Sequence, residues 1–258
     1  MKQNKALAAW RAGQQTIGGW LSLANTHTAE MMAHAGFDWL CIDLQHGPLD
    51  YADLLHMLPA ISTTDTTPLV RVAANTPDQI MKVLDAGAMG VIVPMINSRS
   101  EAMAAVSACG YPPLGSRSFG PLRAALSHGG DYAAQANDQI ACIVMVETRD
   151  GLENLEEIVT TPGLGGVYIG PADLALALGL PAKGDTDDPV HLGSVTNIFD
   201  ACQHHGVPVG IHTSGLDFSR RRLAAGFNFV TLGSDAGFLS RAMTADLAAA
   251  RASLTKRA

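Results

Sequence analysis

The sequence predicts an α/β fold in which one domain, residues 1–258, forms a single (β/α)8 TIM barrel. The first observation is the length, because 258 residues is close to the roughly 250 that one such barrel needs. The second is that short apolar runs alternate, from Ile17 onward, with amphipathic or alanine-rich stretches, a pattern that builds parallel sheets. The third is the number of these units, because eight repeats favour closure of the sheet.

The strands are expected at the short apolar runs. They cover residues 17–23, 39–43, 69–72, 90–94, 140–147, 166–169, 208–211 and 229–232. Capping residues and glycines set the predicted ends of the helices between them. The expected helix starts are Thr26 or Thr28, Thr76, Ser98, Ser214 and Ser234, and the expected ends are Gly36, Gly87 and Gly226.

Two segments, 110–138 and 180–189, have the composition of irregular loops. Because they come after the fourth and sixth strands, we expect both at the rim where the strands end, which is where barrel enzymes place their active sites. The last helix, 234–251, carries Leu239, Met243 and Leu247 on one stripe. From the pattern alone the stripe could seal the barrel floor or pack on another subunit, and packing within the barrel is the simpler interpretation.

Composition excludes several classes of function. The formal charge is −7 and the longest basic block is residues 220–222, so nucleic acid is not an expected partner. No apolar run approaches the roughly 18 residues that a membrane span requires, and we expect no membrane partner. The four cysteines are far apart and form no CxxC pair, which argues against a zinc or redox motif and fits a cytoplasmic protein.

Two acidic residues follow neighbouring predicted strands at the point where each strand ends. Glu147 ends an apolar run, and Asp173 comes just after the next one. Both should lie at the same rim of a parallel barrel, where carboxylate oxygens suit a hard divalent cation. Each residue also has an alternative role. Glu147 could form a salt bridge with Arg71 or Arg149, and Asp173 could be an acid in the first turn of a helix.

Other polar residues are predicted at the same rim. Arg71 stands between apolar neighbours at a strand end, where a guanidinium needs an anion such as a carboxylate or a substrate oxygen. His46 is the best candidate base, because Asp43 three residues earlier could orient its imidazole and raise its pKa. His212 could line the pocket or simply end the seventh strand. Met145 should lie one layer below Glu147, since side chains alternate along a strand.

The lysines and one further acid complete the list of candidates. None of the five lysines, Lys2, Lys5, Lys82, Lys183 and Lys256, stands at a strand end, where a Schiff-base lysine would belong. Barrel chemistry on a carbonyl substrate would therefore need a metal. Asp85 lies at the end of a predicted helix, where an acid opposes the helix dipole. We expect it to contact a histidine or arginine of another subunit, unless it is simply an exposed acid.

Several motifs together resemble a known family. They are IDLQHGP, PLVRV, LDAGAMGVIVPMINS, YPPLGSRSFGP, MVETRDGLENLEEI and VYIGPADLALALG, in this order and spacing. From residue 18 to residue 237 the chain resembles the metal-dependent class II pyruvate aldolases of the HpcH/HpaI (4-hydroxy-2-oxoheptanedioate aldolase) family. The resemblance implies a TIM barrel and a hexamer built from dimers that exchange the eighth helix. It therefore favours an intersubunit contact for the stripe on the last helix.

The resemblance also implies roles for individual residues. It implies metal ligation by Glu147 and Asp173, basic catalysis by His46 and stabilisation of an enolate oxygen by Arg71. It implies that Asp85 increases the basicity of the histidine. The backbone turn that holds the substrate carboxylate matches Gly170, Pro171 and Ala172. Many members carry glutamine where this chain has Met145, so the resemblance leaves the preferred donor open.

The reaction implied is the reversible cleavage of a 4-hydroxy-2-oxo acid to pyruvate or hydroxypyruvate plus an aldehyde. The expected cofactor is Mg²⁺, Mn²⁺ or Co²⁺, and the expected partners are the small oxo acid, the aldehyde and further copies of the chain. Two alternatives remain. The first is a related lyase for a CoA thioester or phosphorylated substrate, since serine–glycine pairs follow the last two strands. The second is a non-catalytic oxoacid-binding protein.

Overall fold

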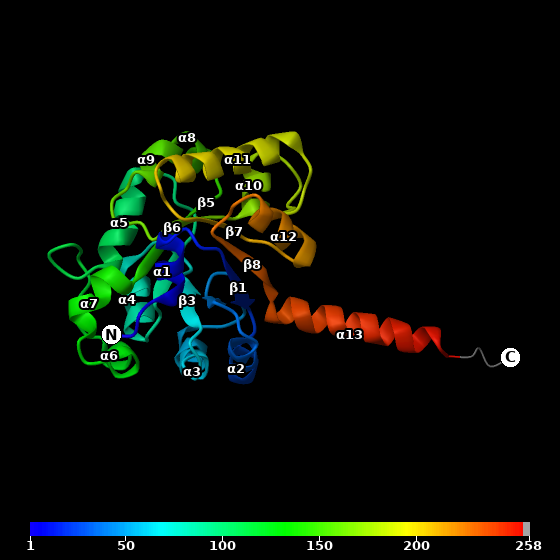
Figure 1. Cartoon of the computed structure of the whole chain (residues 1–258), viewed down its shortest axis with the longest axis horizontal. Coiled ribbons are helices and arrows are strands. Elements are labelled where there is room, and N and C mark those ends of the chain that lie inside the picture. Colours follow the sequence, from blue (N-terminus) through cyan, green and yellow to red (C-terminus); the bar gives the residue numbers. More distant parts are fainter. Residues whose placement is uncertain (255–258) are drawn as a thin grey trace.

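A computed structural model describes residues 1–254 and shows eight parallel strands closed into a barrel. Each strand pairs with its neighbours in chain order, and β8 pairs with β1 to complete the ring (Figure 1). The strands are β1 Thr16–Leu21, β2 Trp39–Asp43, β3 Thr67–Arg71, β4 Gly90–Val93, β5 Ala141–Val146, β6 Gly166–Ile169, β7 Val209–Ile211 and β8 Phe229–Ser234. The predicted fold class and all eight predicted strands are confirmed, and no strand boundary differs by more than two residues.

The helices follow the strands and surround the barrel (Figure 1). They are α1 Lys5–Arg11, α2 Thr26–His34, α3 Tyr51–Ile61, α4 Pro77–Asp85, α5 Arg99–Cys109, α6 Leu122–His128, α7 Tyr132–Gln139, α8 Arg149–Glu153, α9 Leu155–Val159, α10 Pro171–Ala177, α11 Pro189–His204, α12 Leu216–Ala224 and α13 Asp235–Ala252.

Most predicted helix ends are confirmed. The confirmed starts are Thr76, Ser98 and Ser234, and the confirmed glycine ends, all with positive φ, are Gly36, Gly87 and Gly226. Two predicted starts are wrong. Asn25, rather than Thr26 or Thr28, caps α2, because its side chain accepts the Thr28 N–H. Gly215, rather than Ser214, precedes α12.

The barrel floor is closed by α1, a helix that the sequence pattern did not predict. Its buried residues Ala6, Leu7 and Trp10 belong to the apolar cluster that fills the barrel interior. Trp10 stacks on Phe229 with ring centroids 4.3 Å apart. The idea that the α13 stripe seals the floor is therefore wrong, because α1 occupies that place.

Segment 110–138 lies at the amino-terminal end of the barrel rather than at the catalytic rim. It contains α6 and α7, so it is not a continuous irregular loop. The His128 ring bonds to the Gly87 carbonyl at 2.9 Å, and His128 accepts the Lys2 N–H at 2.8 Å. The prediction failed because the segment follows α5, which has already returned from the rim. Segment 180–189 does lie at the rim, where Gly184 faces Pro171.

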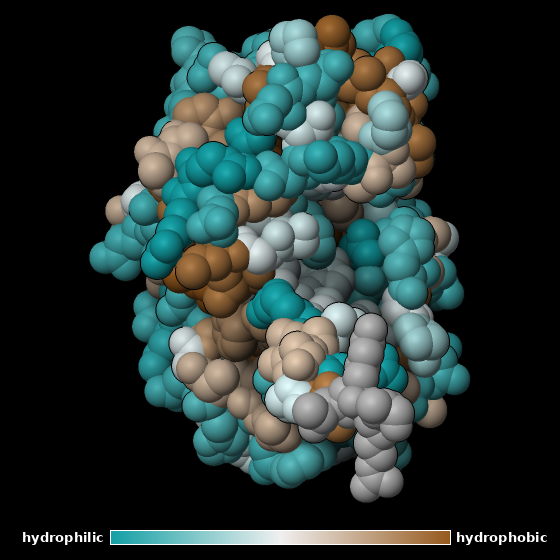
Figure 2. Space-filling model, turned by 90° about the vertical axis from the view of Figure 1, so that its right-hand side faces the viewer, coloured by the Kyte–Doolittle hydropathy of each residue, from teal (hydrophilic) through white to brown (hydrophobic). Residues whose placement is uncertain are grey.

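Helix α13 projects away from the barrel into solvent (Figure 1). Leu239, Met243 and Leu247 are 51%, 57% and 51% exposed, so about half of each side chain of the stripe is open to solvent. Asp235 anchors the start of the helix, because its carboxylate accepts the N–H groups of Ser22 and Leu23. Figure 2 looks at the side from which α13 projects and shows apolar patches on this face.

No helix within residues 1–254 combines the length and the apolar character needed to cross a membrane.

Two glycines allow a test of barrel packing. A Cβ at Gly210 would overlap the buried ring of Phe229, whereas a Cβ at Gly193, within α11, would meet no atom within 4 Å. We expect Gly210→Ala to lower the free energy of unfolding by about 1–3 kcal/mol through overpacking. The control Gly193→Ala should raise it by up to about 1 kcal/mol through helix propensity. Urea unfolding of both variants checks this, and equal effects would contradict the packing described.

Candidate functional site

A cavity of about 380 Å³ opens at the carboxyl ends of the barrel strands. Its lining includes most of the residues predicted from the sequence: Asp43, Arg71, Met145, Gly170, Pro171, Ala172, Asp173 and His212. The lining also includes residues that sequence reasoning did not select, among them Trp20, Ser22 and Phe218. The topology brings these side chains together because they lie at the carboxyl ends of the strands or in the segments that follow them at the same rim.

Arg71 and Asp43 form a buried ion pair at the cavity wall. The Arg71 Nε donates to Asp43 Oδ1 at 2.8 Å, and Nη2 donates to Oδ2 at 2.6 Å. Burial alone would raise the pKa of Asp43, but the Arg71 guanidinium outweighs burial and lowers it. Such a bidentate pair fixes the plane of the guanidinium. Nη1 donates to no residue within the described chain and is available to a ligand.

Trp20 completes this cluster. Its indole Nε1 donates to Asp43 Oδ2 at 3.0 Å, and the Arg71 guanidinium lies 5.0 Å from its ring centroid. The edge of the ring also meets His212, with centroids 4.8 Å apart. A tryptophan near the end of the first strand is a weak sequence signal, because the same pattern is common for a core residue.

His46 is exposed on the rim, and its contact with Asp43 differs from the one we predicted. Asp43 Oδ1 accepts the backbone N–H of His46 at 3.2 Å and that of Gln45 at 3.1 Å. The Asp43 side chain therefore orders the loop that carries His46 but forms no hydrogen bond with the imidazole. The predicted orientation of the ring by Asp43 is wrong because Arg71 and Trp20 take up the carboxylate.

Glu147 is only 2% exposed, and one of its oxygens has no partner. Oε1 accepts the Met95 N–H at 3.0 Å, while Oε2 bonds to no group in the described chain. Burial is the main reason that the pKa of Glu147 is raised to about 7, and the negative charge of Asp173 raises it further. The hydrogen bond from the Met95 N–H and the positive charge of Arg71 lower this pKa in part. The alternative salt bridge is not formed, because Arg71 pairs with Asp43 and Arg149 is exposed.

The unpartnered Oε2 points to a place that suits a cation. Asp173, in the first turn of α10, is close enough for its charge to act on Glu147. Gly170 makes room for this oxygen, because a Cβ there would overlap Glu147 Oε2. Residues 1–254 contain no group of three or more His, Cys, Asp and Glu side chains that could hold a metal. Two carboxylates still suffice for a cation such as Mg²⁺, which keeps several water ligands.

His212 is a neutral group in the cavity wall. Burial and then the positive charge of Arg71 lower its pKa to about 4, so the imidazole is uncharged at pH 7. Its Nδ1 lies 3.2 Å from the hydroxyl of Tyr168, which also bonds to Thr231. His212 therefore lines the pocket, in agreement with one of its two predicted roles.

Asp85 lies at the opposite end of the barrel from this cavity. It ends α4, which runs from the rim back to the amino-terminal end. Its carboxylate pairs with Arg117 at 2.6 Å, and the Arg117 guanidinium lies 4.6 Å from the ring centroid of Tyr111. We expected a histidine or arginine of another subunit, but the arginine is in the same chain. Asp85 does not enter the cavity of its own chain.

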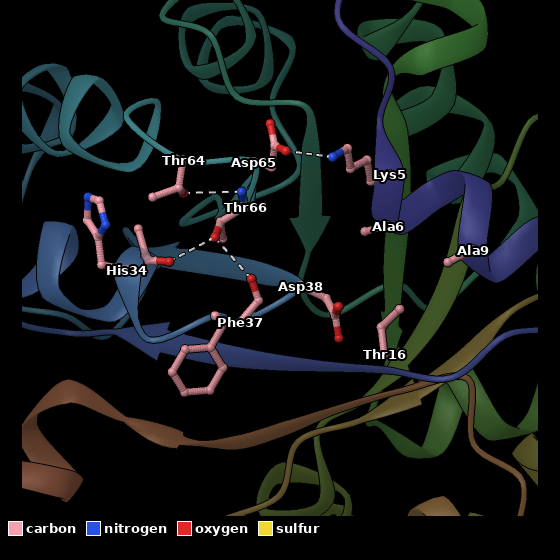
Figure 3. A pocket seen from close by; sticks show the side chains of 12 residues that line it. Lys5, Ala6, Ala9, Thr16, His34, Phe37, Asp38, Thr64, Asp65 and Thr66 are labelled. Carbon is pink, nitrogen blue, oxygen red and sulfur yellow. Dashed lines mark hydrogen bonds and ion pairs between the residues drawn. The ribbon is translucent and has the colours of Figure 1, made fainter.

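A larger cavity of about 460 Å³ lies at the amino-terminal end (Figure 3). Thr16, Asp38 and Thr66 line it at the beginnings of the first three strands, and the exposed Lys5–Asp65 ion pair borders it. It holds none of the predicted site residues. Because barrel active sites lie at the carboxyl ends of the strands, we assign the chemistry to the smaller cavity.

The lysine prediction agrees with the described structure. Lys2 and Lys5 lie at the amino-terminal end, Lys82 lies on α4, Lys183 is exposed in segment 180–189, and Lys256 falls outside the described residues. Of the side chains that line the rim cavity in residues 1–254, Arg71 is the only cation.

The chain is similar to proteins of one aldolase family. The profile of the HpcH/HpaI aldolase/citrate lyase family matches residues 16–242. A hydroxypyruvate/pyruvate aldolase of Rhizorhabdus wittichii is 42% identical over 249 residues, 96% of this chain and 99% of the relative. A 4-hydroxy-2-oxo-heptane-1,7-dioate aldolase of Escherichia coli is 38% identical over 246 residues, 94% of this chain and 93% of the relative.

A solved structure gives the same result. A crystal structure of an HpcH/HpaI aldolase/citrate lyase family protein from Burkholderia cenocepacia superposes with a TM-score of 0.91 at 35% identity, covering 96% of this chain and 100% of that one. The chain is therefore a carbon–carbon lyase of the aldolase type and belongs to the HpcH/HpaI aldolase/citrate lyase family.

Proposed function

We propose that this aldolase reversibly cleaves a 4-hydroxy-2-oxo acid to pyruvate or hydroxypyruvate plus an aldehyde, with a divalent cation as cofactor. The observation that carries the proposal is the buried Glu147 Oε2, which has no hydrogen-bond partner in the described chain and lies close to Asp173, beside a cavity lined by Arg71 and Asp173. The relatives named for pyruvate, hydroxypyruvate and 4-hydroxy-2-oxo-heptane-1,7-dioate support this substrate class.

Glu147 and Asp173 would hold the cation, which we propose is Mg²⁺, Mn²⁺ or Co²⁺. When bound, such a cation supplies a Lewis acid that polarises the 2-oxo group of the substrate. The turn of Gly170, Pro171 and Ala172 lines the cavity beside these ligands and would hold the substrate carboxylate. His191 steadies this turn, since its Nε2 lies 2.8 Å from the Pro171 carbonyl oxygen.

His46 would act as the base. It takes the proton of the 4-hydroxyl as the C3–C4 bond breaks, and the hydroxyl carbon leaves as the aldehyde. The electron pair of the broken bond passes to C3 and onto the 2-oxo oxygen, which gives an enolate. Arg71 would donate from Nη1 to that oxygen, and protonation at C3 then gives the oxo acid. In this scheme Asp85 would increase the basicity of the histidine of another subunit, because it lies far from the rim of its own barrel.

The alternative of a phosphorylated or CoA substrate receives less support. Asp235 places a carboxylate in the first turn of α13, just after Gly233 and Ser234, where a phosphate would otherwise bind. Arg71 is the one cationic side chain that lines the cavity within the described chain, and it is already paired with Asp43. No further cation of the lining is therefore available to bind a phosphate. The non-catalytic alternative is excluded by membership of an aldolase family.

We also propose that the chain forms a cytoplasmic homo-oligomer, a hexamer arranged as a trimer of dimers, with α13 exchanged between the subunits of each dimer. The half-exposed stripe of Leu239, Met243 and Leu247 supports the exchange, since a helix of this length gains little stability without a packed face. The four cysteines are all free and buried, which suits a reducing compartment.

Removal of metal should test the cofactor. We expect protein dialysed against EDTA to lose pyruvate release from 4-hydroxy-2-oxo acids, and added Mg²⁺, Mn²⁺ or Co²⁺ to restore it. Borohydride together with substrate should not inactivate the enzyme, because no Schiff base forms. Undiminished turnover after chelation, or covalent trapping of substrate by borohydride, would overturn the metal mechanism.

Arg71→Ala should lower kcat by on the order of a hundredfold or more, as for other donors to an oxyanion. The substitution also leaves Asp43 buried without its partner, so circular dichroism and the thermal midpoint are needed to show that the variant folds. Arg71→Lys keeps the charge but not the bidentate geometry, so its kcat should lie between those of the wild type and Arg71→Ala. Wild-type turnover in a folded Arg71→Ala variant would reject the role of Arg71.

Charges on the apolar stripe should test the exchange of α13. We expect Leu239→Asp combined with Leu247→Asp to shift the mass measured by light scattering to that of smaller species, since a carboxylate cannot be buried there unpaired. The control Ala245→Asp points roughly to the opposite side of the helix and should leave the mass unchanged. An unchanged mass in the double variant would refute the stripe as an interface.

A further inference from the structure

Met95 adopts a backbone conformation that its type of side chain rarely takes. It lies just beyond β4 with φ of 59°, in the left-handed region, and it is the one non-glycine residue of the described chain with a positive φ. Its side chain is 49% exposed, so burial of the methionine does not explain the conformation. A strained residue persists where its surroundings require the geometry, most often at functional sites.

The hydrogen bonds around Met95 show what the conformation achieves. The Met95 N–H donates to Glu147 Oε1 at 3.0 Å, and the next N–H, that of Ile96, donates to the Met145 carbonyl oxygen at 3.2 Å. Successive N–H groups of a regular strand point to opposite sides. Two successive donors can reach the same end of β5 only if the backbone leaves the extended region at Met95.

The bond to Oε1 sets the orientation of the Glu147 carboxylate. Glu147 is buried, and with one oxygen held by Met95 the other lies against Gly170 without a hydrogen-bond partner in the described chain. Gly170 makes room for Oε2 and the Met95 N–H bonds to Oε1. Together they fix one orientation of the Glu147 carboxylate. Rotation of the carboxylate away from this position would leave the Met95 N–H without its acceptor.

We propose that Met95 is a positioning residue whose left-handed backbone holds Glu147 in the orientation that lets it share a divalent cation with Asp173. The inference rests on the proposed function, because it requires that Glu147 is a metal ligand. Groups that hydrogen-bond to metal ligands typically change metal affinity by roughly 10- to 100-fold when they are lost. The role belongs to the backbone of residue 95, and its side chain is incidental.

A series of substitutions separates the backbone role from a side-chain role. Glycine and asparagine tolerate the left-handed region well, alanine less well, and the β-branched valine poorly. A side-chain role predicts the opposite order, because valine is the most similar to methionine in apolar character. We expect Met95→Gly and Met95→Asn to keep the Mn²⁺ affinity within about threefold of wild type, and Met95→Val to weaken it about tenfold or more.

The measurement is titration of Mn²⁺ into metal-free protein without substrate, followed by electron paramagnetic resonance or calorimetry. Circular dichroism and the thermal midpoint establish that each variant folds. If Met95→Val does not fold, Met95→Ala replaces it and should bind Mn²⁺ more weakly than Met95→Gly. If Met95→Val or Met95→Ala bound Mn²⁺ more tightly than Met95→Gly and Met95→Asn, the proposed role of Met95 would be overturned, whereas the proposed function would stand. A wild-type protein that binds no Mn²⁺ would overturn the proposed function and this inference together.

Discussion

The structure of the site depends on a buried carboxylate that lacks a hydrogen-bond partner for one of its two oxygens. Glu147 stands just past the end of β5, where the barrel removes it from water, and only one of its oxygens is satisfied by the protein. An ionised carboxylate in such a place is costly unless a positive charge or a proton compensates it. The neighbouring Asp173 increases that cost, and this is the physical basis of the proposed cation site.

The remaining polar groups are fixed before any ligand arrives. Arg71 is held in plane by Asp43, Asp43 is held by Trp20 and by the loop that carries His46, and Met95 holds Glu147. Groups held in this way need little reorganisation when charge develops on a substrate, which is the main source of electrostatic catalysis. The cavity is therefore ordered from two sides, by the first three strands and by the β4–β6 strand ends.

The two ends of the barrel have different tasks. The carboxyl end holds the candidate site, whereas α1 closes the amino-terminal end, and α6 reaches this end through the bonds of His128 to Gly87 and Lys2. Asp85 and Arg117 lie at this second end, and α13 leaves the barrel altogether. These features have no evident function within one chain, and they acquire one only in the proposed oligomer.

Length and sequence pattern were enough to predict the barrel, its eight strands and most of the cavity residues, including Arg71, Asp173 and His212. This was possible because the residues that end parallel strands must meet at one rim, so their positions in the chain predict their convergence. Three features became visible in the folded chain alone. Asp43 pairs with Arg71 rather than with the His46 ring, segment 110–138 lies at the opposite end of the barrel, and the Met95 N–H bonds to Glu147. These arrangements depend on contacts between distant strands and on one backbone angle, and neither leaves a periodic pattern in the sequence.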